Sequence, residues 1–335
     1  MLRFFLLLLV CWSGSNAPHT RKFEPQNYQT ADGALVLQTG GNYIEPYFAT
    51  KSLLIAEDAG LDIRQSALAW IRWGLAHQNS QGLLNRYCQK PGEAWYECGA
   101  ADADDSMLAL WLQLLYRMSS GAGLPPEWQS SARKAESRLA HLRNRRLGLY
   151  HVSDRNHVAL LMDNVEVYSA LRDIAAAKSR FGNEKGARQT TQDAEKLASA
   201  IQHVFWNKRA QWYRPSMQKN TPHFYPDVVA QVYPWLAGLS APGQDVQESW
   251  TRWKSRFASA WLESSYDPHP WGLVALAALK TGDKDSAGCW FVHARPLRYS
   301  SRWNVLEEAV YQGLEQRFSD EQPADVAACT QAADR

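Results

Sequence analysis

The stretch "GAADADDSMLALWLQLLYRM", residues 99–118, joins a short acidic loop to a strongly apolar segment. Over residues 106–118 the apolar positions recur at spacings of three and four, which predicts a helix with a wide apolar face. Asp102, Asp104 and Asp105 lie at its start, where an aspartate caps free N–H groups and is stabilised by the helix dipole. One aspartate is enough for a cap, so three together indicate a further role for at least one of them.

The same apolar spacing recurs along the rest of the chain. It is found in residues 47–60, 66–78, 129–144, 164–181, 192–206, 228–239, 249–262, 272–282, 285–294 and 304–318. With residues 106–118 these ranges predict about eleven or twelve helices, and no long alternating run of β-branched residues separates them. The connections are short, which favours antiparallel helical hairpins. We therefore predict an all-α fold.

Polar turns that lead to an aromatic residue recur at roughly 65-residue intervals, in "AHQNSQGLLNRY", "HLRNRRLGLYHV" and "VFWNKRAQWYRP". This weak internal repeat is typical of helical hairpins that close into a ring of alternating inner and outer helices. All connections that enter inner helices then open on one face. Those segments are "GNYIEPY" (41–47), "GAADADDS" (99–106), "SDRNHVALLMDNVEVY" (153–168), "TPHFYPDV" (221–228), "SSYDPHPWG" (264–272) and "RYSSRWNVLEE" (298–308).

Polar and aromatic residues concentrate in these six segments, which we call the mouth segments, whereas "AEDAGLD" and "LKTGDKD" are plain solvent turns. Binding residues tend to lie on loops that a rigid scaffold holds. We expect a binding or catalytic site on the face that the mouth segments share.

The composition limits the function. The chain has 335 residues, of which 45% are apolar and 21% charged, and this suits one large globular domain or two. The formal net charge is only +2, which gives no single-signed surface for a nucleic acid. There is no dinucleotide-binding glycine motif, phosphate-binding loop or calcium loop, so we expect no cofactor and no metal.

The first 17 residues, "MLRFFLLLLVCWSGSNA", resemble an export signal, with Arg3 ahead of an apolar core and small residues before a cut after Ala17. We expect a periplasmic or secreted protein in which residues 18–335 form a single domain, with no membrane span after cleavage. A retained anchor is the alternative. In an oxidising compartment Cys88 and Cys98 are expected to form a disulfide across a short loop. Cys289 and Cys329 are a further candidate pair, which would tie down the C-terminal tail, and free buried thiols are the alternative for all four.

At this point the chain resembles the six-hairpin (α/α) toroid glycosidases, over nearly all of residues 18–335. Its acidic loop is similar to the signature of glycoside hydrolase family 8, which Ala100, Asp102, Ala103, Asp104 and Met107 match, while Ala101 and Leu108 depart from it. The resemblance implies an (α/α)6 toroid with Asp102 as the catalytic base. It also implies that the acid is a glutamate at the start of the first inner helix, where Glu45 stands among apolar neighbours that would raise its pKa.

The candidate catalytic residues are therefore Glu45, Asp102 and Asp104. The candidate substrate-binding residues come from the mouth segments and their surroundings; they are Tyr43, Tyr47, Trp95, Asp105, Asp163, Asn164, His223, Tyr225, Tyr266, His269, Trp271, Arg302, Trp303 and Glu307. The aromatic members suit stacking on sugar rings. Glu307 and Glu308 begin the last helix, where some toroid enzymes keep a catalytic glutamate; adjacent helical residues diverge by about 100°, so we expect one of the two to face solvent.

Three functions remain open. The first is an exported, monomeric, inverting glycoside hydrolase that cuts a polysaccharide or oligosaccharide, such as a bacterial exopolysaccharide or cell-wall glycan. The second is a polysaccharide lyase or unsaturated-uronyl hydrolase, in which a tyrosine or histidine acts while Arg302 or Arg155 neutralises a uronate. The third is a carbohydrate-binding or secretion protein without catalytic activity.

Overall fold

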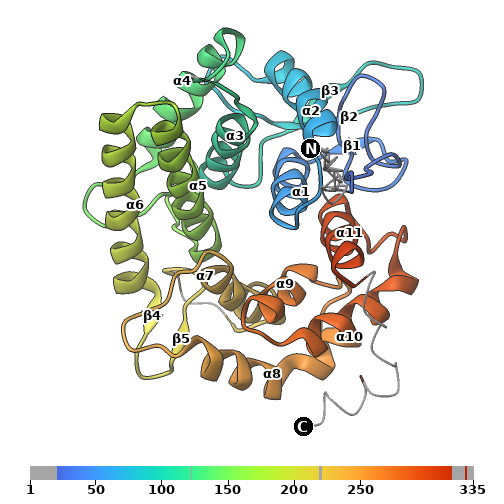
Figure 1. The fold of residues 1–335 in the computed structure, drawn as a ribbon, viewed down its shortest axis with the longest axis vertical. Coiled ribbons are helices and arrows are strands. Elements are labelled where there is room, and N and C mark those ends of the chain that lie inside the picture. The colour runs from blue at the N-terminus through green and yellow to red at the C-terminus, as the bar shows by residue number, and fades with distance from the viewer. Residues whose placement is uncertain (1–20, 122, 219–220, 319–328, 330–335) are drawn as a thin grey trace, which may run out of the picture.

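The computed structural model describes residues 21–121, 123–218, 221–318 and 329, so the predicted export signal at residues 1–17 lies outside the described part of the chain. Six inner helical elements form a closed ring, in which each packs against the next and the last packs against the first (Figure 1). They are α1 (Pro46–Asp58), α3 (Asp104–Met118), α5 (Leu161–Arg180), α7 (Val232–Leu236), α9 (Gly272–Lys280) and α11 (Val305–Phe318). A π-helical turn, η1 (Phe224–Val228), and a 3-10 turn, η2 (Val229–Gln231), lead into α7.

Outer helices connect the inner ones and form the rim in Figure 1. In the described residues they are α2 (Arg64–His77), α4 (Pro126–Leu142), α6 (Glu184–Phe205), α8 (Val246–Leu262) and α10 (Lys284–Ala294), and a 3-10 turn, η3 (Arg295–Leu297), follows α10. All eleven predicted helical ranges are helical, which confirms the predicted all-α toroid of hairpins.

The sequence explains which helices are inner and which are outer. Fourteen of the 15 residues of α3 are buried, because its neighbours cover it on every side. In α6, by contrast, the buried residues recur at three- and four-residue spacing and the other faces are polar. Trp111 of α3 donates its Nε1–H to Ser131 Oγ of α4 at 2.9 Å, so a large ring and a polar tie join the inner helix to the outer one.

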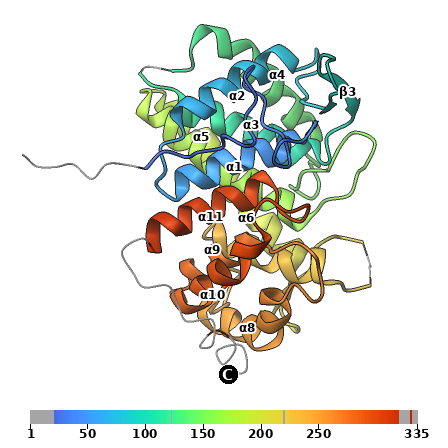
Figure 2. The same ribbon diagram turned by 90° about the vertical axis from the view of Figure 1, so that its right-hand side faces the viewer.

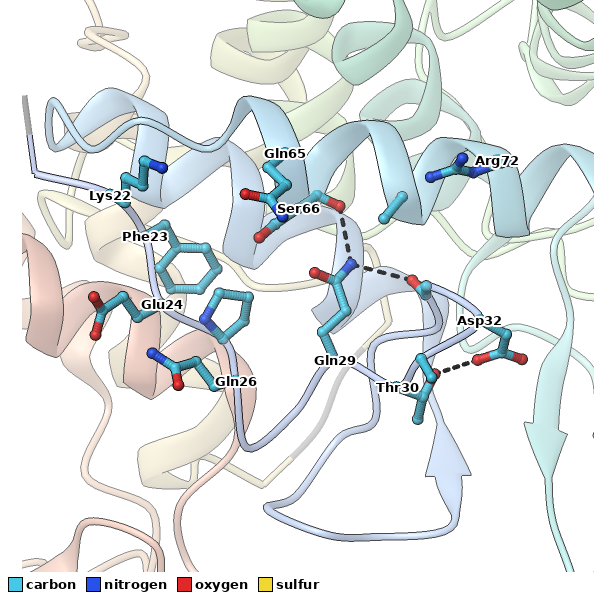
Figure 3. Close-up of a pocket in the computed structure, with 14 residues that line it drawn as sticks. Lys22, Phe23, Glu24, Gln26, Gln29, Thr30, Asp32, Gln65, Ser66 and Arg72 are labelled. Carbon is cyan, nitrogen blue, oxygen red and sulfur yellow. Dashed lines mark hydrogen bonds between the residues drawn. The ribbon is translucent and has the colours of Figure 1, made fainter.

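The segment before α1 is not helical and lies between α2 and α11. The backbone N–H of Glu24 donates to Gln312 of α11 at 2.9 Å, and Gln29 Nε2 donates to the carbonyl oxygens of Ser66 and Gly33 at 3.0 and 3.2 Å (Figure 3). These hydrogen bonds fix the segment against α2 and α11 on the outer side of the ring, where the first and last inner helices are adjacent.

The strands are short and belong to the loops. A three-stranded antiparallel sheet contains β1 (Tyr43–Ile44), β2 (Arg86–Cys88) and β3 (Tyr96–Gly99), and a second pair contains β4 (Trp206–Asn207) and β5 (Trp212–Tyr213). A disulfide joins Cys88 to Cys98 across the β2–β3 hairpin, and a second joins Cys289 to Cys329. Figure 2 shows the ring from the side, with β3 and the long loops on the right. Within the described residues no helix is both long and apolar enough to cross a bilayer.

Candidate active site

A cavity of about 310 Å³ lies where the N-terminal ends of the inner helices meet. Each of the six mouth segments contributes to its lining. The polar and aromatic lining residues are Tyr47, Phe48, Asp102, Ser106, Asp163, Tyr225, Tyr233, Asp267, His269, Trp271, Asn304 and Glu307. We call this space the central cavity. The sequence therefore located the shared face, and seven candidate residues lie together on it: Tyr47, Asp102, Asp163, Tyr225, His269, Trp271 and Glu307.

Larger depressions lie elsewhere, two of them with about twice this volume. One, of about 670 Å³, is an outer groove between the segment before α1 and α2, with Gln65 and Arg72 along one wall (Figure 3). The other, of about 690 Å³, lies at the C-terminal ends of inner helices and contains Arg117 in ion pairs with Asp58 and Asp173. Neither depression is lined by residues of the mouth segments. The volume of a depression therefore does not by itself identify the site.

Glu307 is the carboxyl group of the cavity that is best suited to proton transfer. It lies in the first turn of α11, is only 5% exposed, and lines the central cavity. Burial raises the pKa of Glu307 to about 7, against the opposing effect of the Gly272 backbone N–H, which donates to Glu307 Oε2 at 2.8 Å. A carboxyl group with a pKa near neutrality can give or take a proton at physiological pH.

The adjacent residue, Glu308, has a structural role. Glu308 is 1% exposed and accepts hydrogen bonds from Arg298 Nε at 2.9 Å, Trp303 Nε1 at 3.0 Å and Gln312 Nε2 at 2.8 Å. The expectation that one of the two glutamates faces solvent is wrong, because the loop before α11 folds over Glu308 and supplies Arg298. This network fixes the start of α11 and with it the position of Glu307.

Glu45 and Asp102 meet at one guanidinium group. Arg86, on β2, forms an ion pair with Glu45 through Nε and with Asp102 through a second nitrogen at 3.1 Å. Glu45 is buried, and burial raises its pKa while Arg86 opposes that rise; Asp102 is 75% exposed at its side chain. Asp102 lines the central cavity and Glu45 lies outside its lining. The ion pair favours the anionic form of Glu45, but burial outweighs it. The place of Glu45 outside the cavity lining is what suits a structural role better than that of a proton donor.

A buried polar cluster lies beneath the cavity. Lys51 of α1 forms an ion pair with Glu166 of α5 and donates to the hydroxyls of Tyr47 and Tyr233 at 2.7 and 3.1 Å. Lys51 and Glu166 are each 7% exposed at the side chain. The pair neutralises itself inside the ring and ties α1 to α5 and α7.

Asp105 and Asp163 lie next to this cluster. Burial is the larger cause that raises the pKa of Asp105 well above its usual range, and the nearby Asp163 adds to it. Burial likewise raises the pKa of Asp163, with Glu166 and Asp102 as further causes. Asp105 Oδ2 and Asp163 Oδ2 are buried without a hydrogen-bond partner, and of the two residues only Asp163 lines the cavity.

Several predicted site residues lie outside the cavity lining. Asp104 interacts electrostatically with Arg138 of α4 and with Asp154, Asn164 binds the backbone of Tyr150 through both its amide atoms, and the Trp303 indole is buried. The other predicted residues outside the lining are Tyr43, which donates to Glu45 at 3.4 Å, Trp95 near the β2–β3 hairpin, Asp105, His223, Tyr266 and Arg302. Asp104, Asn164 and Trp303 therefore have partners within the protein, and their predicted roles stay predictions.

Aromatic rings line one wall of the mouth. Tyr225 and Trp271 stack with centroids 4.8 Å apart and an interplanar angle of 14°, and Tyr225 is 45% exposed. Tyr266, 68% exposed, lies beyond Phe224 at 6.3 Å between centroids. Flat rings with polar edges that lead from a cavity to solvent suit a sugar ring and its chain.

Sequence reasoning missed Arg86, Lys51, Glu166, Ser106 and Tyr233. Lys51 is four residues after Tyr47 and Glu166 three after Asp163, so helical spacing from predicted residues was a usable signal. Arg86 lies on β2, at the end of one of the recurring polar turns, and only the fold brings it to Asp102. Among the described residues, no cluster of three or more His, Cys, Asp or Glu side chains is arranged to hold a metal ion.

Comparison with known proteins supports the fold. No protein-family profile matches the sequence, and no curated protein is detectably similar to it. Among solved structures, the chain is similar to the GH63 mannosylglycerate hydrolase from Thermus thermophilus in complex with glucose, with a TM-score of 0.54, 12% identity, and coverage of 87% of this chain and 97% of that one. For a protein described as a novel alpha-amylase from Clostridium perfringens the TM-score is 0.54 and the identity 12%, with coverage of 87% of this chain and 95% of that one. For the rhamnosidase from Klebsiella oxytoca with rhamnose bound the TM-score is 0.52 and the identity 12%, with coverage of 85% of this chain and 56% of that one.

Proposed function

We propose that the protein is a glycoside hydrolase that removes a terminal sugar from a glycan in the central cavity. The observation that carries this proposal is Glu307, a buried carboxyl group with a pKa of about 7 that lines the cavity together with Asp102. Glycoside hydrolysis needs two carboxyl groups, one of which protonates the leaving oxygen. The toroid fold, shared with three solved proteins described as a hydrolase, a rhamnosidase and an amylase, supports the same class of reaction.

In this mechanism Glu307 is the general acid. It donates its proton to the glycosidic oxygen as the bond from that oxygen to the anomeric carbon breaks. Asp102, exposed to solvent and held by Arg86, removes a proton from a water molecule that attacks the anomeric carbon from the opposite side. One bond breaks, one forms, and the anomeric configuration inverts. Asp102 is also the residue that the family 8-like motif marks as the base, so this role is kept, whereas the acid role passes from Glu45 to Glu307.

The dimensions of the cavity favour the end of a chain. A volume of about 310 Å³ lies at the lower end of the range for small-ligand sites and suits one sugar residue better than a stretch of polysaccharide. The rings of Tyr225 and Tyr266 then carry the next sugars. We further propose that the protein is exported and monomeric and acts on an extracytoplasmic glycan, on the basis of its N-terminal sequence and its two disulfides.

A lyase or uronyl hydrolase has less support. Those reactions need a cation near the uronate, and neither Arg155 nor Arg302 is among the described residues that line the cavity. A non-catalytic sugar-binding protein would have no need for Glu307 to keep a pKa near 7.

The test is a digest of terminal aryl glycosides and oligosaccharides by the purified chain and by Glu307→Gln. We expect wild type to release free sugar, with new reducing ends and no absorbance increase at 235 nm, and the variant to be at least about 100-fold slower. A rise at 235 nm would indicate a lyase. Sugar binding without release by wild type would indicate the non-catalytic alternative.

A further inference from the structure

The central cavity holds more carboxyl groups than hydrolysis needs. Asp102 and Glu307 are sufficient for the proposed reaction. Asp163 and Asp267 line the same space, and Asp105 is fully buried near Asp163. Of these, Asp105 and Asp163 are buried, and buried carboxyl groups are costly unless they are protonated or balanced by a cation. The surplus therefore calls for an explanation beyond the reaction.

No side chain of the lining supplies that balance. The described residues around the cavity include no lysine or arginine. Lys51, on the α1 side, is paired with Glu166, and its ammonium group already has the Tyr47 and Tyr233 hydroxyls as further partners. His269 lines the rim and is exposed.

The second nearby cation is Arg86, and it is held by Glu45 and Asp102 at the edge of the mouth. The charged groups that act on Asp163 are consequently the carboxyl groups of Glu166 and Asp102, which raise its pKa, and Lys51, which lowers it by the smallest of these effects. Burial raises the pKa of Asp163, so it holds a proton when no ligand is present. A cation in the cavity would displace that proton and pair with the carboxylate.

Unsatisfied atoms mark where such a cation would bind. Ser106 Oγ and Asp163 Oδ2 are buried without a hydrogen-bond partner, and both residues line the cavity at 1% and 8% exposure. An ammonium group has three donors and no acceptor, which suits a hydroxyl oxygen and a carboxylate oxygen. Trp271 Nε1 also lacks a partner and is a donor for a sugar hydroxyl.

Aromatic rings complete the environment. The stacked pair Tyr225 and Trp271 lines the cavity, and cations are attracted to the ring faces of both residue types. The protein already uses this arrangement below the cavity, where Lys51 Nζ lies 5.0 and 4.3 Å from the ring centroids of Tyr47 and Tyr233.

We propose that the sugar bound in the central cavity is a hexosamine with a free amine, whose ammonium group binds Asp163 and Ser106. This inference rests on the proposed function for the nature of the ligand, a sugar, and adds its charge. Neutral sugars leave Asp163 and Ser106 without charged partners, and uronates place a further negative charge among the carboxyl groups.

The test measures binding separately from cleavage. Glucosamine, glucose, N-acetylglucosamine and glucuronate are titrated calorimetrically into Glu307→Gln at pH 6.5, and the series is repeated with galactosamine and mannosamine and their neutral counterparts. Charge-assisted hydrogen bonds predict that at least one amine binds ten- to about 100-fold more tightly than its neutral counterpart. Titration in two buffers of different ionisation enthalpy is expected to show proton release with the amine and none with the neutral sugar.

The added substitution Asp163→Asn should abolish the preference, leaving the amine and the neutral sugar within about threefold, whereas the matched surface change Asp32→Asn should keep it. Melting temperatures of both variants establish that they fold. Equal binding of amine and neutral sugar, or tighter binding of the uronate, overturns the inference. If the amine preference appears but wild type cleaves no glycoside, the hydrolase proposal fails while the inferred ligand class stands. If neutral glycosides are cleaved without amine preference, the hydrolase proposal stands and the inferred ligand class fails.

Discussion

The backbone N–H of Gly272 donates to Glu307 Oε2 at 2.8 Å, which joins the first residue of α9 to the first turn of α11 at the central cavity. The bond orients a buried carboxyl group without neutralising it. It also leaves no room for a side chain, because a Cβ on Gly272 would lie 2.6 Å from Glu307 Oε2 and 2.8 Å from Trp290 Cζ2.

Gly272→Ala should therefore damage both stability and activity. Overpacking of this kind costs about 1–3 kcal/mol of unfolding free energy, and displacement of Glu307 should lower kcat by more than about tenfold. Denaturant unfolding and steady-state kinetics measure the two effects. Gly99→Ala, whose Cβ would meet Arg86 Cδ at an ordinary 3.7 Å, is the control for stability. Wild-type stability and kcat in Gly272→Ala would show that the close contact does not position Glu307.

The raised pKa of Glu307 makes stability depend on pH. The carboxyl group loses its proton near pH 4.5 in the unfolded chain and near pH 7 in the folded protein, so between these values the folded state holds the extra proton. Stability from this group is complete below pH 4.5 and is lost as pH rises to about 7, by an amount on the order of 3 kcal/mol. Glu307→Gln should flatten that fall in a series of denaturant unfolding curves. An unchanged pH profile in the variant would mean that Glu307 titrates normally.

Arg86 is expected to hold the edge of the mouth together. Arg86→Gln leaves the buried Glu45 without its ion pair, which should cost on the order of 3 kcal/mol, and frees Asp102. Addition of Glu45→Gln should restore much of the stability while activity stays low, because Asp102 remains without its partner. Arg21→Gln, which breaks an exposed pair with Glu315, should cost less than about 1 kcal/mol and is the matched control. Full activity in the double variant would show that Asp102 needs no support from Arg86.

The Cys88–Cys98 disulfide closes the hairpin that carries Arg86. Replacement of both cysteines by serine should lower the free energy of unfolding by about 3 kcal/mol, because a loop of this length gains conformational freedom in the unfolded chain. Activity should also fall at temperatures where the variant is still folded, because β2 positions Arg86 at Asp102. Far-UV circular dichroism and kinetics on the same samples separate the two effects. Unchanged kinetics would show that the hairpin is only a surface element.

The ring was predictable because apolar spacing and short connections are local properties of the sequence. The shared face followed from the same pattern, since each polar segment precedes an inner helix. The individual roles were less accessible. Glu307 and Glu308 are adjacent and chemically identical, and only the folded loop that brings Arg298 to Glu308 leaves Glu307 for the cavity. Glu45 and Asp102 share an arginine 41 residues from one and 16 from the other, a contact that no spacing rule contains.

The aspartates of residues 102–105 illustrate the same limit. Within four residues, Asp102 lines the cavity, Asp104 is under the electrostatic influence of Arg138, and Asp105 is buried near Asp163. The predicted aspartate cap is wrong, because Ala103 takes the N-cap position of α3 and makes no side-chain cap hydrogen bond. The separation of the three aspartates depends on the packing of α3 against α4 and α5.

The most direct test of the central claim is the anomer that forms first when a terminal glycoside is cleaved, followed by proton NMR before mutarotation. The account predicts the inverted anomer from wild type, and a loss of rate of at least about 100-fold in both Glu307→Gln and Asp102→Asn, with Asp32→Asn unaffected. A retained anomer, or wild-type rates in Glu307→Gln, would contradict the assignment of Glu307 as acid and Asp102 as base.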